Sequence, residues 1–171
     1  MNYIFAIDSG NVESGYVIVE RNLSRVIDKG KVPNEELLKI IEDFILDTRD
    51  GWKTETIEVA LEMIASYGMA VGKTVFETCV WIGRFQELFH SYGIASEYVY
   101  RSEEKLYLCK SMKAKDSNIR QALIDRFGEV GTKKNQGYFY GFKKDIWAAM
   151  AVAVTYHDKH TVQINTEDLP F

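Results

Sequence analysis

Three carboxylates stand at the ends of apolar segments in this chain. Asp8 closes the segment FAID, Glu62 lies near the end of TIEVALEM, and Asp145 precedes the apolar run IWAAMAVAV. Burying a carboxylate is costly unless a partner offsets its charge. Carboxylates that converge repel one another, and a divalent cation that prefers oxygen ligands, Mg²⁺ or Mn²⁺, relieves the repulsion. One or two such ions activate water for phosphodiester hydrolysis, so the set favours a metal-dependent nuclease site.

Each of these acids taken alone has a structural explanation. Asp8 could stabilise the turn at Ser9 and Gly10 through its own hydrogen bonds. Asp145 could be an acid at a helix start, favoured by the helix dipole, and Glu62 could pair with a nearby lysine. The three together favour the metal site, because each lies at the edge of an apolar element.

Apolar periodicity and turn residues predict the elements that must position these acids. The first two expected strands form an antiparallel hairpin, and the strands cover residues 3–8, 15–20, 24–30, 56–63 and 95–100. Asn34 is the expected N-cap of the first helix, one helix starts near residue 102, and the others cover residues 34–46, 73–92, 117–127 and 144–157. This order predicts an α/β domain with a mixed central sheet of about five strands and helices on both faces. With no linker in the sequence, residues 1–171 are expected to form a single domain.

The charge is unevenly distributed along the chain. The net charge is −4, but residues 101–144 hold eleven Lys/Arg and five Asp/Glu, whereas the remainder holds ten and twenty. Such a basic segment can bind phosphates locally, or it can be a solvated, lysine-rich helical surface. Cys79 and Cys109 lack metal-site or disulfide spacing, which indicates reduced thiols in a cytoplasm. No membrane span or signal peptide is expected.

Several segments, in order, resemble the motifs of RuvC-type Holliday junction resolvases, which have the RNase H-like fold. IDSG followed by SGY is similar to the family's Ile-Asp-Pro-Gly and Thr-Gly-Tyr, and ALE is similar to its second acidic motif. Asp145 followed by AMAVAVT resembles its C-terminal acidic helix. The resemblance covers about residues 2–156, and the segments that carry it are 7–10, 14–16, 60–62, 102–105 and 114–119. The sequences of residues 67–72 and 76–83 resemble those of the phage-type branch of this family.

The resemblance implies a homodimer that grips a four-way DNA junction and nicks two strands symmetrically, in a bacterial host cytoplasm if phage-encoded. Asp8, Glu62 and Asp145 would bind Mg²⁺, with Mn²⁺ able to substitute, and Lys105 would lie near the scissile phosphate. Tyr67 would stack on bases at the crossover, or it is an ordinary loop tyrosine. The lysines expected to contact the DNA backbone are Lys110, Lys113, Lys115, Lys133, Lys134, Lys143 and Lys144.

The sequence departs from the family pattern at two positions. The usual fourth acid is Ala148 here, which leaves the number of bound ions, one or two, open. A second family lysine falls on Asp116, so that Lys113 or Lys115 serves instead, or Asp116 itself joins the site. The helix from residue 74 to 92 is expected to pack against its twin, to cover the sheet, or to do both.

The segment GTKKNQGYFYGFKK mixes lysines with aromatics, as in a DNA-contacting loop or in a loop whose aromatics enter the core. The favoured function is a Mg²⁺-dependent, structure-selective DNA endonuclease that resolves four-way junctions by paired hydrolysis, with water as the nucleophile. One alternative is a broader branched-DNA or RNase H-like nuclease. Another is a junction-binding module with an impaired catalytic site. An actin-like ATPase, suggested by DSG, needs a longer chain.

Overall fold

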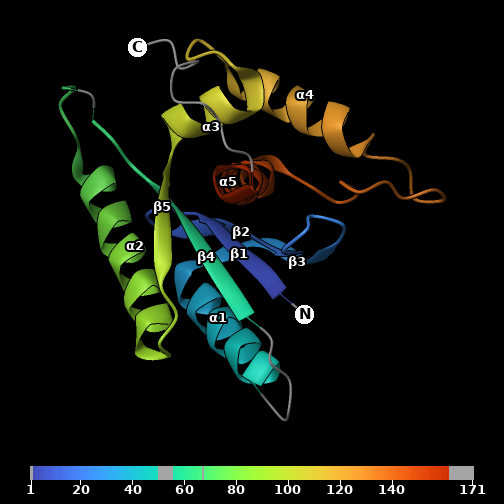
Figure 1. Ribbon diagram of the computed structural model, residues 1–171. Helices are drawn as coiled ribbons and strands as arrows, with labels where there is room; N and C mark the ends of the chain where they lie inside the picture. Colours follow the sequence, from blue (N-terminus) through green and yellow to red (C-terminus); the bar gives the residue numbers. More distant parts are fainter. Residues whose placement is uncertain (1, 50–55, 67, 162–171) are drawn as a thin grey trace.

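A five-stranded mixed sheet forms the centre of the molecule. The computed structural model describes residues 2–49, 56–66 and 68–161. The strands lie in the order β3-β2-β1-β4-β5 (Figure 1), with β1 to β3 antiparallel and with β4 and β5 parallel to β1. Their bounds are Asn2–Asp8 (β1), Glu13–Glu20 (β2), Val26–Pro33 (β3), Thr56–Met63 (β4) and Ser96–Tyr100 (β5). The predicted hairpin and mixed sheet are confirmed.

Helices cover both faces of this sheet, as predicted. In Figure 1, α1 and α2 lie on one face, while α5 lies against the other, with α3 and α4 beyond it. The helices are Asn34–Arg49 (α1), Lys73–Ser91 (α2), Arg101–Cys109 (α3), Asp116–Phe127 (α4) and Lys144–Thr161 (α5). No helix in the described part of the chain has the length and apolar character that crossing a membrane requires.

The alternation of side chains along the strands decides which face receives the acids. In β1, Ile4 and Ala6 pack in the core under α5, whereas Phe5 and Ile7 pack under α1 and α2. Successive side chains of a strand point to opposite faces, so Asp8 falls on the α5 face. In β4, Ala60 packs in the core under α5, whereas Val59 and Leu61 pack in the core under α1 and α2. The same alternation places Glu62 on the α5 face, as it does Asp8.

α5 is buried almost all round, because it lies between the sheet and the other helices of its face. Its buried residues run from Ile146 to Tyr156 without an exposed position, although Ala148 is half-buried at the cleft described below. Each fully buried large apolar side chain contributes roughly 1.5–3 kcal/mol relative to exposure. The apolar composition that predicted a buried helix is therefore explained by its central position.

Most element boundaries differ from the prediction by one to four residues, and three of the differences are instructive. β3 runs from Val26 to Pro33, rather than over residues 24–30, because its pairing with β2 continues to Glu13 and Pro33. α5 continues to Thr161. α3 begins at Arg101, near the predicted start at residue 102, and its first turn is closed by a 2.8 Å hydrogen bond from the Tyr100 backbone N–H to Glu103.

The aromatics of the loop between α4 and α5 enter the core. Phe139 is fully buried and its ring centroid is 4.6 Å from that of Trp147. Phe142 is also buried, and the Tyr138 hydroxyl donates to the Leu23 carbonyl at 2.9 Å. Of the two interpretations of this mixed segment, burial of its aromatics is the one observed.

Candidate active site

The three predicted acids line one cleft, at the edge of the sheet where β1 and β4 end and α5 begins. The cleft has a volume of about 650 Å³. β1 and β4 are parallel to each other, so their carboxyl ends meet at this edge. This is why Asp8 and Glu62, which are far apart in sequence, come together. Its charged lining consists of Asp8, Glu62, Asp116, Asp145, Arg101, Arg120 and Lys144.

Asp8 and Glu62 form a hydrogen-bonded carboxyl pair. The parallel register pairs Ile7 with Leu61, so the two acids that follow lie side by side. Burial is the main cause that raises the pKa of Asp8 to about 9, and the neighbouring Glu62 raises it further. Burial also raises the pKa of Glu62. At neutral pH a proton, or a cation in its place, therefore has to lie between these carboxyl groups.

Gly15 brings Asp145 to this pair. Gly15 is the cross-strand partner of Asp8 in β2. A Cβ atom at Gly15 would lie 2.3 Å from the Asp145 carbonyl oxygen and 2.9 Å from the Asp145 Cβ. The absence of a side chain thus lets the start of α5 lie directly against β2, and this contact places the third acid. The Asp145 carboxylate forms an ion pair with Lys31 of β3 at 2.8 Å.

A hydrogen-bond network stiffens the turn that follows Asp8. The Gly10 backbone N–H donates to the Ser14 hydroxyl at 3.1 Å, and that hydroxyl donates to the Asn34 side chain at 2.6 Å. The Asn34 amide returns a hydrogen bond to the Gly10 carbonyl at 2.9 Å. Asn34 does start α1 as predicted, but its side chain is occupied with this turn and ties the end of β1 to the helix.

Two further charged residues of α3 belong to this region and were missed by sequence reasoning. Arg101, the first residue of α3, pairs with Glu104 and with Asp116. Glu104 is fully buried, and burial raises its pKa to about 7 although Arg101 opposes the shift. Glu103 and Glu104 look alike as first-turn acids. The signal for Glu104 is its spacing of four from Leu108, which packs against the core.

Lys105 comes from α3, and its expected place near the scissile phosphate stays a prediction. It lies half-buried on α3, one position beyond Glu104, and is not among the described residues that line the cleft. The cations that do line it are Arg101, Arg120 and Lys144. The Arg120 guanidinium lies over the Trp147 ring at 4.7 Å, a cation–π contact that holds it at the cleft.

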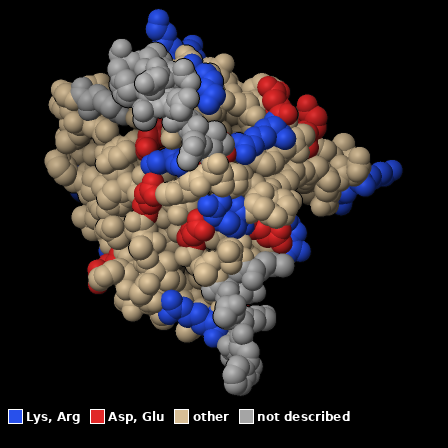
Figure 2. Space-filling view, in the orientation of Figure 1, with Lys and Arg blue, Asp and Glu red and all other residues tan. Residues whose placement is uncertain are grey.

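The other predicted DNA-contacting lysines are exposed around the same end of the molecule. Basic side chains lie at the tip of the α4–α5 loop, which projects to the right in Figures 1 and 2, and acidic and basic groups are intermixed on the face shown. Tyr67 lies outside the described residues. The exposed lysines are Lys110, Lys113 and Lys115 between α3 and α4, Lys133 and Lys134 in the loop, and Lys143 and Lys144 at α5.

The donor set fits a hard divalent cation in its chemistry. As the side chains lie, no three acidic, His or Cys groups of the described residues are arranged to hold one ion together. Asp145 is turned to Lys31, and Asp8 hydrogen-bonds Glu62. Carboxylate oxygens that face one another in a cleft are nevertheless the ligands that Mg²⁺ and Mn²⁺ prefer. Ala148 presents a methyl group to the cleft, where the resemblance places a fourth acid.

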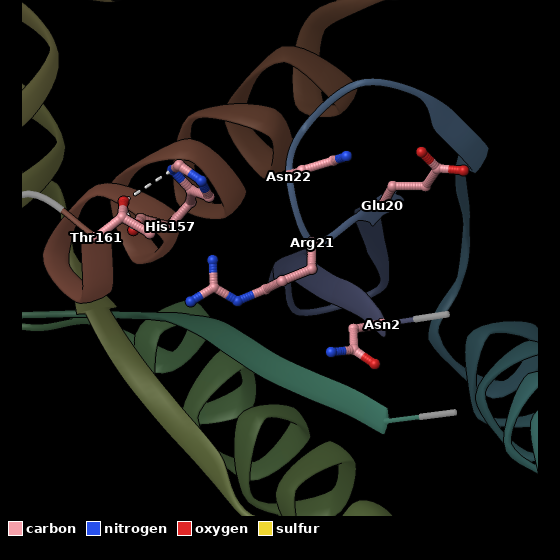
Figure 3. A pocket seen from close by; sticks show the side chains of 6 residues that line it. All are labelled: Asn2, Glu20, Arg21, Asn22, His157 and Thr161. Atoms are coloured by element: carbon pink, nitrogen blue, oxygen red, sulfur yellow. Dashed lines mark hydrogen bonds between the residues drawn. The ribbon is translucent and has the colours of Figure 1, made fainter. Parts of the chain in front are cut away.

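A second hollow lies at the opposite end of β1 and α5. Its volume is about 590 Å³, and Arg21 extends into it from the β2–β3 turn, towards the end of α5 that carries His157 (Figure 3). Arg21 pairs with Glu58 at 2.8 Å, and His157 contacts Asp158 and Thr161. Arg21 and His157 thus already have partners, and Glu20 is the one carboxyl group among the described residues that line this hollow.

The carboxyl pair of Asp8 and Glu62 predicts that the stability of the fold depends on pH. The folded protein keeps this proton up to a pH near 9, whereas an ordinary Asp releases it near 3.8. Unfolding therefore releases a proton between these values, and the free energy of unfolding of the metal-free protein falls as the pH rises. The slope is on the order of 1 kcal/mol per pH unit, or about 3 °C in Tm.

The measurement is a series of thermal melts in EDTA between pH 5 and pH 8. Wild type should lose Tm with rising pH more steeply than Asp8→Asn, because the substituted amide cannot titrate. Equal slopes in the two proteins would contradict the assignment of the shared proton to Asp8.

Solved structures with the same fold identify the architecture. No protein-family model matches this sequence, and no curated protein sequence matches it. T. thermophilus RuvC in complex with a Holliday junction substrate is similar with a TM-score of 0.63 and 15% identity, over 95% of this chain and 97% of that chain. A second structure, of Thermus thermophilus RuvC, has the same TM-score and identity, over 92% of this chain and 95% of that chain. The chain therefore has the RNase H-like fold of RuvC, as predicted.

Proposed function

We propose that this chain is a metal-dependent, structure-selective DNA endonuclease that resolves four-way junctions by paired phosphodiester hydrolysis. The observation that carries the proposal is the meeting of Asp8, Glu62 and Asp145 in one cleft, at the carboxyl edge of β1 and β4. The similarity in fold to a RuvC bound to a Holliday junction supports the choice of substrate.

The acids and cations of the cleft have separate roles in this proposal. Asp8, Glu62 and Asp145 would hold Mg²⁺ or Mn²⁺, which when bound activates a water and neutralises charge on the leaving oxygen. Arg120 and Lys144 bind the phosphate backbone at the cleft, where the exposed lysines of the α3–α4 connection and the α4–α5 loop extend the contact. Arg101, which lines the cleft, would offset charge at the scissile phosphate together with Lys105, for which the resemblance implies that role.

The outer face of α2 is the surface that suits a homodimer. Phe76 is 61% exposed and Val80 is 63% exposed, and they are one turn apart on the same side of the helix. Two large apolar side chains at this spacing form a stripe that a second copy of the helix would cover. The inner face of α2, with Ile82 and Phe85, is buried in the core beneath the sheet, so the helix covers the sheet and leaves its outer face for the proposed dimer.

Phe76→Glu should convert the dimer to a monomer, because it places a charge at the centre of that stripe. Light scattering coupled to size exclusion measures the mass directly. Leu46→Glu, at a 51% exposed apolar position of α1, is the matched control and should leave the mass of a dimer. A dimer that survives Phe76→Glu would place the interface elsewhere.

A nicking assay tests the proposed activity. A synthetic four-way junction and a linear duplex of the same sequence are incubated with the protein in EDTA, Mg²⁺ or Mn²⁺. Symmetric paired nicks in the junction alone, dependent on the metal, are expected. Cutting of many branched substrates would favour the broader nuclease. Tight junction binding without cutting in either metal would favour a binding module, the alternative that Ala148 supports by removing an acid from the cleft.

A further inference from the structure

We propose that Glu104 is an additional carboxylate of the cation site, which joins Asp8 and Glu62 and supplies the negative charge that Ala148 lacks. The inference rests on the proposed function, because it concerns the ion of that same cleft. Glu104 comes from α3, whereas position 148 is on α5, so the site would be built from a different element.

The placement of Glu104 follows from the sheet. β5 is the parallel neighbour of β4, with Met63 opposite Tyr100, and α3 starts at the residue after Tyr100. The first turn of α3 therefore lies beside the end of β4. Glu104 is 0% exposed there, and its carboxyl group contacts that of Glu62.

One oxygen of Glu104 lacks a donor. Arg101 pairs with the Oε2 atom, while Oε1 has no hydrogen-bond partner among the described residues. A fully buried carboxylate oxygen without a partner is costly. A purely structural ion pair with Arg101 leaves this oxygen unsatisfied, whereas a cation beside Glu104 and Glu62 would satisfy it.

The balance of charge supports the same conclusion. Asp8, Glu62 and Glu104 are close enough to affect one another's ionisation, and Arg101 is the cation that acts on all of them. Arg101 also divides its guanidinium between Glu104 and the exposed Asp116. One fully buried and two half-buried carboxylates with one shared guanidinium leave negative charge that a divalent ion would neutralise.

Mn²⁺ binding measured by electron paramagnetic resonance, on the full chain stripped with EDTA, tests the inference without reference to cleavage. Glu104→Gln keeps the size of the side chain and an acceptor for Arg101, but removes the charge. Mn²⁺ affinity should fall about 10–100-fold, the loss typical of residues that support a metal site. Glu103→Gln, in the same helical turn but paired with Lys159, is the matched control and should bind as wild type does.

The outcomes separate this inference from the proposed function. If Glu104→Gln binds Mn²⁺ as tightly as wild type while Asp8→Asn does not, Glu104 is only a partner of Arg101 and the inference is wrong. If wild type binds no Mn²⁺, the metal site fails as a whole. Glu104→Asp guards against misfolding of the Gln variant: it keeps the charge but withdraws it from Glu62, and unchanged affinity in that variant would also overturn the inference.

Discussion

Asp8→Asn is expected to abolish junction cleavage and to leave junction binding intact. Asp8 lies at the centre of the acid cluster, against Glu62 and within electrostatic reach of Asp145. An amide keeps the shape of the side chain but removes the charge that would hold the ion. The cleavage rate should fall at least about 100-fold, the scale of losing an electrostatic group at a reaction centre.

Single-turnover cleavage and a gel-shift titration on the same four-way junction separate the two effects. The proposed DNA contacts come from the lysines and arginines outside the acid pair, so the dissociation constant should be unchanged. Asp125→Asn makes the same change at an exposed position of α4 and should cut as wild type does. Full cleavage by Asp8→Asn would mean that the metal site is misassigned.

Gly15→Ala has the second largest expected effect, although Gly15 carries no functional group. Its added methyl group would lie 2.3 Å from the Asp145 carbonyl oxygen, closer than any real contact, so the start of α5 must move away from β2. Overpacking of this kind costs about 1–3 kcal/mol. A displacement of about 1 Å at a reacting centre can cost about 100-fold in rate.

Both consequences are measurable in one variant. Chemical denaturation gives the loss of stability, and junction cleavage at saturating protein gives the loss of rate. Gly83→Ala adds the same methyl group in α2, where nothing lies within 4 Å, and should retain both stability and cleavage. A fully active Gly15→Ala would show that the position of Asp145 does not matter for the reaction.

The order of the elements was predictable from the sequence, whereas the meeting of the two acids depended on a strand adjacency that the sequence left open. Strand alternation in FAID and TIEVALEM decides which side chains share a face, because successive residues of a strand point to opposite sides. Parallel strands end at the same edge of a sheet, so the observed pairing of β1 with β4 places Asp8 beside Glu62. The prediction that concerns Tyr67 stays untested, since that residue lies outside the described residues.

Sequence alone could not choose between neighbours on α3. Glu104 and Lys105 are adjacent, and in a helix they point about 100° apart. The docking of α3 beside β4 brings Arg101 to the cleft and buries Glu104 against it, whereas Lys105 stays half-buried on the helix. The burial of Phe139 was undecided for the same reason, because its segment suited both DNA and core.

The sequence by itself therefore determined the order of strands and helices, the fold class and the candidate acids. The tertiary structure alone decided the meeting of Asp8 with Glu62, the pairing of Asp145 with Lys31, the close approach of Gly15 to α5, and the burial of Glu104. The physical reason is the separation along the chain of the residues that interact. Periodicity is a local property that depends on the backbone repeat of one element, whereas these contacts join residues of different elements and depend on how whole helices pack against the sheet.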